Sequence, residues 1–192
     1  MKRLLVLAIV LAIVFTIGIA IASDPPSVDA QEVWTPLSHA DLMKEAGLTH
    51  GGFYGHFSSK DDLIAEASAR ALARSLALFS NLSERASHDP LSSITRAYLT
   101  SKHRDDPGTG CLLAAVGSDV SRQRPAVRRA VTDHIRSAVE LLTKLVPGRS
   151  RAARRQKAIR TYATLVGAMV MARAVDDREL SQEILDAGRA SA

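Results

Sequence analysis

Cysteine, aromatic residues and strand-type patterns are scarce in this sequence. Cys111 is the only cysteine among 192 residues, which excludes an intrachain disulfide framework and a multi-cysteine zinc site. Aromatic residues make up only 4% of the chain, and alternating runs of β-branched residues are few, so the composition argues against an all-β fold. The sequence also has no paired metal ligands at helical spacing, no nucleophile elbow and no phosphate-cradling loop. We therefore expect no metal, no cofactor and no enzymatic activity.

The first 22 residues have the pattern of a membrane signal. Residues 4–22 are uncharged and almost entirely apolar, and Lys2 and Arg3 precede them. A run of this length spans the roughly 30 Å hydrocarbon core of a bilayer as a helix, whereas its small residues at Ala20 and Ala22 fit a signal-peptide cleavage site. We expect a transmembrane or signal-like segment at residues 1–22, inserted in the membrane through residues 4–22, and a linker at residues 23–37.

The rest of the chain predicts an all-α fold. Capping residues, prolines and apolar periodicity indicate helices at 39–46 and 50–57, a long helix after Ser59, and helices at 90–98, 111–120, 125–145, 151–174 and 178–188. Residues 103–110 are expected to form a loop because they contain Pro107, Gly108 and Gly110. The helix periodicity assigns the following residues to inner faces: Leu63, Ala67, Ala71, Leu78, Val127, Val131, Ile135, Ala138 and Leu142.

The positive charge is concentrated in one region. Residues 122–160 hold 12 basic and 2 acidic residues, a net charge of +10, whereas residues 39–67 carry 2 basic and 5 acidic residues, a net charge of −3. The basic region suits nucleic acid or an anionic membrane surface. A solvated helix face explains it better than either partner, so the charge alone does not select a partner.

Residues 42–67 contain the most informative motif, LMKEAGLTHGGFYGHFSSKDDLIAEA. The order is a helix, a tight turn at Gly47, a short helix and a new helix start at Ser59, which is the plan of a helix-turn-helix. Three of the eight aromatic residues lie between 53 and 57. Gly51 and Gly52 disfavour a helix chosen for stability alone, but they allow the backbone to approach another surface closely.

This segment resembles the DNA-binding module of the TetR/AcrR family of bacterial transcriptional repressors. The residues after Lys60 are similar to the ligand-binding and dimerisation domain of that family, and the resemblance covers roughly residues 36–188. It implies a helix-turn-helix module at 38–66 and a helical ligand-binding and dimerisation domain at 67–192. It also implies a ligand-responsive repressor that binds palindromic operator DNA, responds to an unknown small-molecule effector and forms a homodimer.

The resemblance assigns roles to individual residues. Thr49, His50 and Gly51 would open the recognition helix and contact base edges. Tyr54, His56 and Lys60 would contact phosphates. Phe53 and Phe57 would be core residues. The dimer is expected to form through helices 151–174 and 178–188, with an apolar strip of Leu165, Met169 and Val170 at the interface. His134 is expected in the core, on the surface or at an effector cavity.

Three features depart from the family pattern. The membrane-like segment and linker occupy the space of the first DNA-binding helix, Gly55 stands where a basic residue is common, and the net charge of −3 weakens phosphate attraction. These features leave a second hypothesis open, in which the protein is a membrane-tethered or exported helical binding protein that no longer binds DNA. The expected location is cytoplasmic if residues 1–35 derive from a fusion, frameshift or misassigned start, and otherwise the inner membrane or the exported space.

Overall fold

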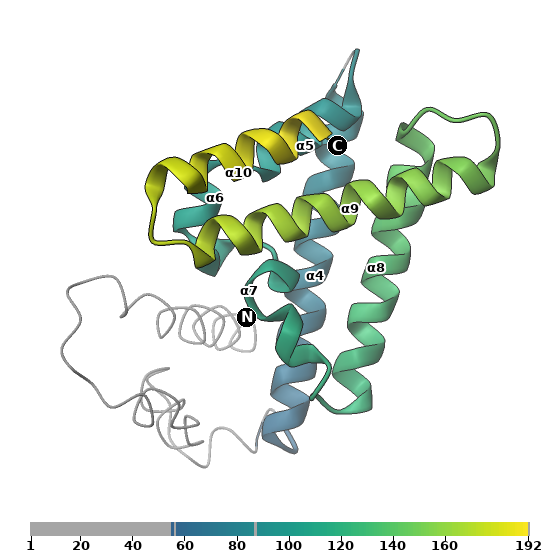
Figure 1. Ribbon diagram of the computed structural model, residues 1–192. Coiled ribbons are helices and arrows are strands. Elements are labelled where there is room, and N and C mark those ends of the chain that lie inside the picture. The colour runs from purple at the N-terminus through teal and green to yellow at the C-terminus, as the bar shows by residue number, and fades with distance from the viewer. Residues whose placement is uncertain (1–54, 56, 87, 192) are drawn as a thin grey trace. The chain divides into compact units, whose positions relative to one another are not determined.

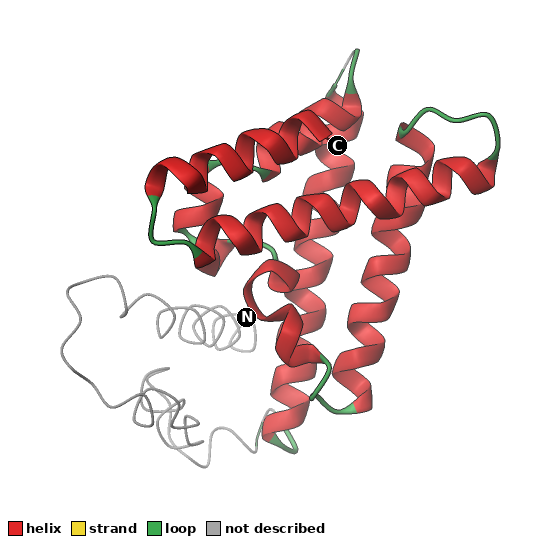
Figure 2. Ribbon diagram, in the orientation of Figure 1, coloured by secondary structure: helices red, strands yellow, loops and turns green. Residues whose placement is uncertain are grey.

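The computed structural model describes residues 55, 57–86 and 88–191 (Figure 1). The chain divides into two compact units, Met1–Ala67 and Ser68–Ala192. The described residues form seven α-helices, one 3₁₀-helix and no strand (Figure 2), which confirms the expected all-α class. The elements are α4 (Lys60–Arg85), α5 (Pro90–Tyr98), α6 (Ser101–Asp105), η1 (Pro107–Thr109), α7 (Leu112–Val120), α8 (Pro125–Leu145), α9 (Arg151–Ala174) and α10 (Arg178–Ser191). The expected membrane segment and the helices at 39–46 and 50–57 lie outside the described residues.

The predicted helix starts are confirmed by their caps. Ser59 Oγ accepts a hydrogen bond from the backbone N–H of Asp62 at 3.1 Å, at the start of α4. The carboxylate of Asp89 accepts one from the N–H of Ser92 at 3.0 Å, and Pro90 occupies the first turn of α5. These side chains satisfy N–H groups that have no partner within the helix, which is why each helix begins there.

The expected loop at 103–110 is wrong, because two short helical elements lie there. Thr100 has an extended backbone and its Oγ1 accepts a hydrogen bond from the N–H of His103 at 3.1 Å, which starts α6. Pro107 then begins the single turn of η1. The proline and glycines that suggested a loop mark the ends of these short elements instead.

Helix α9 lies at the centre of the unit formed by residues 68–191. It packs against α8 and α10, which precede and follow it in the chain, and also contacts α6 and α7 (Figure 1). Its buried side chains join those of α5, α8 and α10 in one apolar core. The largest fully buried side chains of this core are Ile94, Leu99, Leu142, Leu165, Met169 and Leu185. The ring of Phe79 in α4 contacts the rings of Tyr98 and Tyr162 edge to face.

Two residues expected on inner faces are exposed. Leu78 in α4 is 52% exposed and Ile135 in α8 is 38% exposed, whereas their neighbours Phe79 and His134 are buried. The other residues expected on the inner face of α8 are buried, namely Val127, Val131, Ala138 and Leu142, so the expected face is correct except at its edge, where His134 is buried in place of Ile135. In α4, Leu63 and Ala71 are buried as expected, and Phe79 is buried in place of Leu78.

Candidate functional site

The residues expected to contact DNA fall at the edge of the described structure. Thr49, His50, Gly51, Tyr54 and His56 lie outside the described residues. Their roles therefore stay predictions.

Lys60 is the first residue of α4, and the acidic residues Asp61 and Asp62 follow it in the first turn. Phe57 is buried, in agreement with the core role expected for it. The motif therefore ends, as predicted, at a capped helix start.

A buried polar cluster lies where α5, α6 and α7 meet α9. The ring Nδ1 of His103 lies 2.6 Å from the carbonyl oxygen of Tyr98, and the backbone N–H of Cys111 points to its Nε2 at 3.0 Å. Only one tautomer fits both partners, with Nδ1 carrying the proton that it donates to Tyr98 and Nε2 accepting from Cys111. Neutral His103 therefore joins the end of α5 to the start of α7.

Arg173 of α9 completes this cluster. Its guanidinium donates hydrogen bonds to the carbonyl oxygens of His103 at 2.6 Å and of Arg104 at 3.1 Å, so it binds the C-terminal turn of α6. Gly110 allows the close approach, because a Cβ there would lie 2.6 Å from His103 Nε2 and 3.1 Å from an Arg173 nitrogen. Helix α6 is thus fixed to α9 by a cation bound to carbonyl oxygens.

Two buried atoms of this cluster lack a hydrogen-bond partner of ordinary geometry among the described residues. They are the hydroxyl of Tyr98 and Nη1 of Arg173. Burial raises the pKa of Tyr98 well above its usual value, and the neighbouring Cys111 adds to this effect. Burial lowers the pKa of Arg173. Unsatisfied buried polar groups are costly in a folded protein, so these two atoms lower the stability of the cluster.

His134 is a buried core residue that links two long helices. Its Nε2 lies 2.9 Å from the hydroxyl of Tyr162, which joins α8 to α9. Burial lowers the pKa of His134, and a hydrogen bond to the backbone of Leu72 in α4 partly offsets the effect. Burial lowers the pKa of His103 as well, and the charge of Arg173 adds to it. Both imidazoles are therefore held in the neutral form by their surroundings.

The outer face of α9 and α10 is apolar and exposed. Large side chains on it are between 42% and 57% exposed: Ile159, Val170, Met171 and Leu180. A Cβ at Gly167 would meet nothing within 4 Å. Leu165 and Met169, which were expected at a dimer interface with Val170, are instead fully buried within their own chain. Of the expected strip, only Val170 faces outward.

The described residues hold no group of three or more His, Cys, Asp or Glu side chains placed to bind a metal ion. Among the described residues, no helix is long and apolar enough to cross a membrane. Residues 4–22 lie outside the described residues. The expected membrane insertion is therefore neither supported nor contradicted.

Sequence reasoning missed the roles of Tyr98, His103 and Arg173. His103 was assigned to a loop, so its two partners could not be anticipated. A signal for Arg173 was present, because it is the only charged residue between Arg160 and Asp176 in an otherwise apolar stretch of α9. A single cation in such a stretch has a specific partner more often than not.

Comparison with known proteins agrees with the motif and with the fold. Residues 34–67 match the model of the family described as bacterial regulatory proteins, tetR family. No curated protein matches the chain. The structure is similar to that of reduced NemR from E. coli, with a TM-score of 0.69 and 21% identity over 96% of this chain and 93% of that one.

A second similar structure is a TetR-family transcriptional regulator from Agrobacterium tumefaciens. The TM-score is 0.65 and the identity 25%, over 80% of this chain and 85% of that one. A transcriptional regulator from Pseudomonas aeruginosa PAO1 gives a TM-score of 0.67 at 18% identity, over 97% and 88% of the two chains. The matched segment contains the helix-turn-helix motif, and the helices that follow share the fold of these regulators. The likeness to the tetR family of bacterial regulatory proteins is therefore carried by residues 34–67, and the likeness of the remaining helices to these regulators is one of fold.

Proposed function

We propose that the protein is a ligand-responsive transcriptional repressor that binds operator DNA as a homodimer. The observation that carries this proposal is the family match at residues 34–67, which contains all six residues expected to contact DNA. In a helix-turn-helix, the second helix enters the major groove, and two copies in a dimer bind half-sites one helical turn apart. A palindromic operator follows from the two-fold symmetry of the dimer.

The dimer is proposed to form through the outer face of α9 and α10. Side chains of Ile159, Val170, Met171 and Leu180 supply exposed apolar surface, and Gly167 leaves room for close approach of a second helix. Apolar surface of this extent on two neighbouring helices is typical of an interface.

The effector is proposed to bind within the helical domain near α5, α6 and α9. The partnerless Tyr98 hydroxyl and Arg173 Nη1 support this position and favour an effector with a hydrogen-bond acceptor on an otherwise apolar body. Binding there would act on the bonds between Arg173 and α6 and so shift the balance between dimers that fit the operator and dimers that do not.

The test of DNA binding is a selection from random duplexes followed by an electrophoretic mobility assay with the selected sequence. We expect a palindromic site, retarded at low salt by a folded dimer and released as salt increases. A folded dimer that selects no sequence would contradict the proposal.

A second candidate function is favoured by residues 4–22 and by the net charge of −3 at residues 39–67. It is a membrane-tethered or exported helical binding protein that retains the ligand-binding domain without DNA binding. Mass spectrometry of the mature N-terminus from soluble and membrane fractions separates the two. A membrane product that retains residues 4–22 supports the second function, and a soluble product that begins elsewhere supports the repressor.

A further inference from the structure

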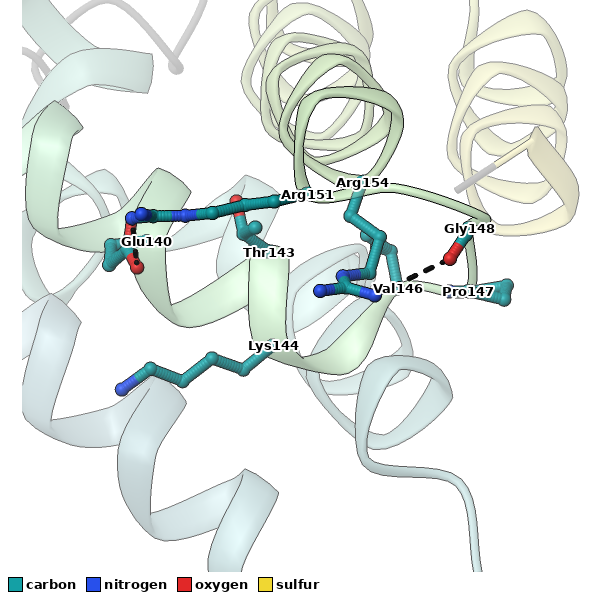
Figure 3. A pocket seen from close by; sticks show the side chains of 8 residues that line it. All are labelled: Glu140, Thr143, Lys144, Val146, Pro147, Gly148, Arg151 and Arg154. Atoms are coloured by element: carbon teal, nitrogen blue, oxygen red, sulfur yellow. Dashed lines mark hydrogen bonds and ion pairs between the residues drawn. The ribbon is translucent and has the colours of Figure 1, made fainter.

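A cavity of about 390 Å³ lies at the turn between α8 and α9, and its lining includes no residue of the cluster at Tyr98 (Figure 3). Two buried residues, Thr143 and Val146, belong to its lining. The other lining residues lie on both sides of the turn: Lys144, Pro147, Gly148 and Arg151, which are exposed, and Glu140 and Arg154, which are half-buried.

The lining is positively charged. Lys144, Arg151 and Arg154 contribute three positive charges and Glu140 one negative charge, so the net charge is +2. The carboxylate of Glu140 is engaged by Arg151 at 3.1 Å and by Arg155, from outside the cavity, at 3.9 Å. Lys144 forms no ion pair with any described residue. The cavity thus holds cations whose charge is only partly neutralised.

The backbone adds to this positive potential. Ser150 caps α9 by accepting a hydrogen bond from the N–H of Ala153, so the first turn of this 24-residue helix lies at the cavity. The first N–H groups of a helix have no partner within the helix, and the helix dipole favours a negative charge there. Gly148 brings the turn against α9, because a Cβ there would lie 2.8 Å from Arg154 Cγ and 3.2 Å from its backbone nitrogen. Nη1 of Arg154 donates to the carbonyl oxygen of Gly148 at 3.4 Å, which directs the guanidinium along the cavity (Figure 3).

We propose that this cavity binds a small phosphorylated molecule that carries two or more negative charges. Two arginines and one lysine match phosphate oxygens in chemistry, and a net charge of +2 matches a dianion. The cavity has the size of a small-ligand site. A concave surface of this size favours a compact anion over a DNA duplex, which needs a long basic surface.

The experiment is titration calorimetry of the full-length protein with sodium tripolyphosphate at low salt. We expect one saturable site per chain. The double variant Lys144→Gln/Arg154→Gln is expected to weaken binding at least about tenfold, because each side chain supplies a charge-assisted hydrogen bond. The matched control is Arg129→Gln, which removes one exposed cation from the same helix outside the cavity and is expected to change the affinity less than about twofold.

Glu140→Gln gives a test with the opposite sign. It removes the carboxylate that competes for Arg151, so tripolyphosphate is expected to bind more tightly. The proposal is overturned if no saturable binding occurs, if Arg129→Gln weakens binding as much as the double variant, or if Glu140→Gln weakens it. It is also overturned if the double variant loses affinity for a random DNA duplex but not for tripolyphosphate.

All the substituted side chains are partly or fully exposed, and circular dichroism checks the fold. Binding is measured without operator DNA, so failure of this site is distinct from failure of the repressor function.

Discussion

At the scale of single residues, Arg173 links α9 to α6. Its guanidinium binds the carbonyl oxygens of His103 and Arg104, and no other charged residue lies between Arg160 and Asp176. Burying an arginine is costly unless carbonyl or carboxylate oxygens surround it. Nη1 of Arg173 nevertheless has no hydrogen-bond partner of ordinary geometry among the described residues, and neither has the hydroxyl of Tyr98 in the same cluster. Such a pair is retained at a cost to stability, which fits a binding role.

We expect Tyr98→Phe to increase the free energy of unfolding by about 1 kcal/mol, because the buried hydroxyl that it removes has only the weakly polar Cys111 thiol as a neighbour and no partner of ordinary hydrogen-bond geometry among the described residues. The same substitution should weaken the response to a polar effector, since it removes the proposed contact. Urea unfolding measures the first effect and effector-induced release of operator DNA measures the second. A decrease in stability would show that the hydroxyl is satisfied in the folded protein.

Lys60 and Thr49 are expected to affect DNA binding in different ways. Lys60→Ala should weaken binding to all sequences alike and reduce the slope of log affinity against log salt by about one, because a phosphate contact is lost. Thr49→Ala should instead change the preferred base near the end of the recognition helix. Fluorescence anisotropy with operator variants at several salt concentrations distinguishes the two. An unchanged salt slope for Lys60→Ala would remove Lys60 from the phosphate contacts.

At the scale of elements, α9 contributes side chains both to the core of its own chain and to an exposed apolar surface. Leu165 and Met169 point into the core, whereas Val170 and Met171 point outward from the next positions along the same helix. Nearly uniform apolarity around a helix is typical of one that is covered on both sides. The outer side of α9 is therefore expected to be covered by the same helix of a second copy.

We expect Gly167→Arg to dissociate the dimer while leaving the fold of each chain intact. A Cβ at this position would lie more than 4 Å from the described atoms around it, and an arginine there would project into the proposed interface. The dissociation constant should increase at least about tenfold, as measured by analytical ultracentrifugation. The control is Leu78→Arg, which places the same charge at an exposed apolar position on α4. If Gly167→Arg remains as dimeric as the control, the interface lies elsewhere.

The sequence predicted helix starts better than it predicted helix faces. Ser59, Asp89 and Pro125 are local signals, because a cap or a first-turn proline acts within three residues of its own position. The burial of His134 in place of Ile135 depends on Tyr162, which is 28 residues away, and no local pattern contains that information. For the same reason the cluster around His103 could not be predicted, since its members, His103 included, come from four different elements.

At the scale of the whole molecule, stability should depend on pH through His103 and His134. The folded protein lowers the pKa of both imidazoles, so the unfolded chain binds more protons as the pH falls below about 6.5. The free energy of unfolding should therefore decrease between about pH 6.5 and the lowered pKa values, and level off below them. Protonation of His103 would also remove the acceptor for the Cys111 N–H and place a second cation beside Arg173.

Urea unfolding at a series of pH values measures this dependence, and NMR titration of the two imidazole rings assigns it. We expect both rings to titrate below their usual pKa, and the double variant His103→Gln/His134→Gln to lose most of the slope. Imidazole rings of the unsubstituted protein with a pKa at or above about 6.5 would contradict the expectation. This measurement does not require the double variant to fold.

The close contact at Gly188 has a mechanical consequence. A Cβ there would lie 2.9 Å from both Ala168 of α9 and Leu99 at the end of α5, and Ser181 Oγ donates to the carbonyl oxygen of Ala172 at 2.6 Å. Helix α10 therefore lies close against α9 and the end of α5, and any side chain at position 188 would force them apart. We expect α9 and α10 to move together when the helical domain changes conformation.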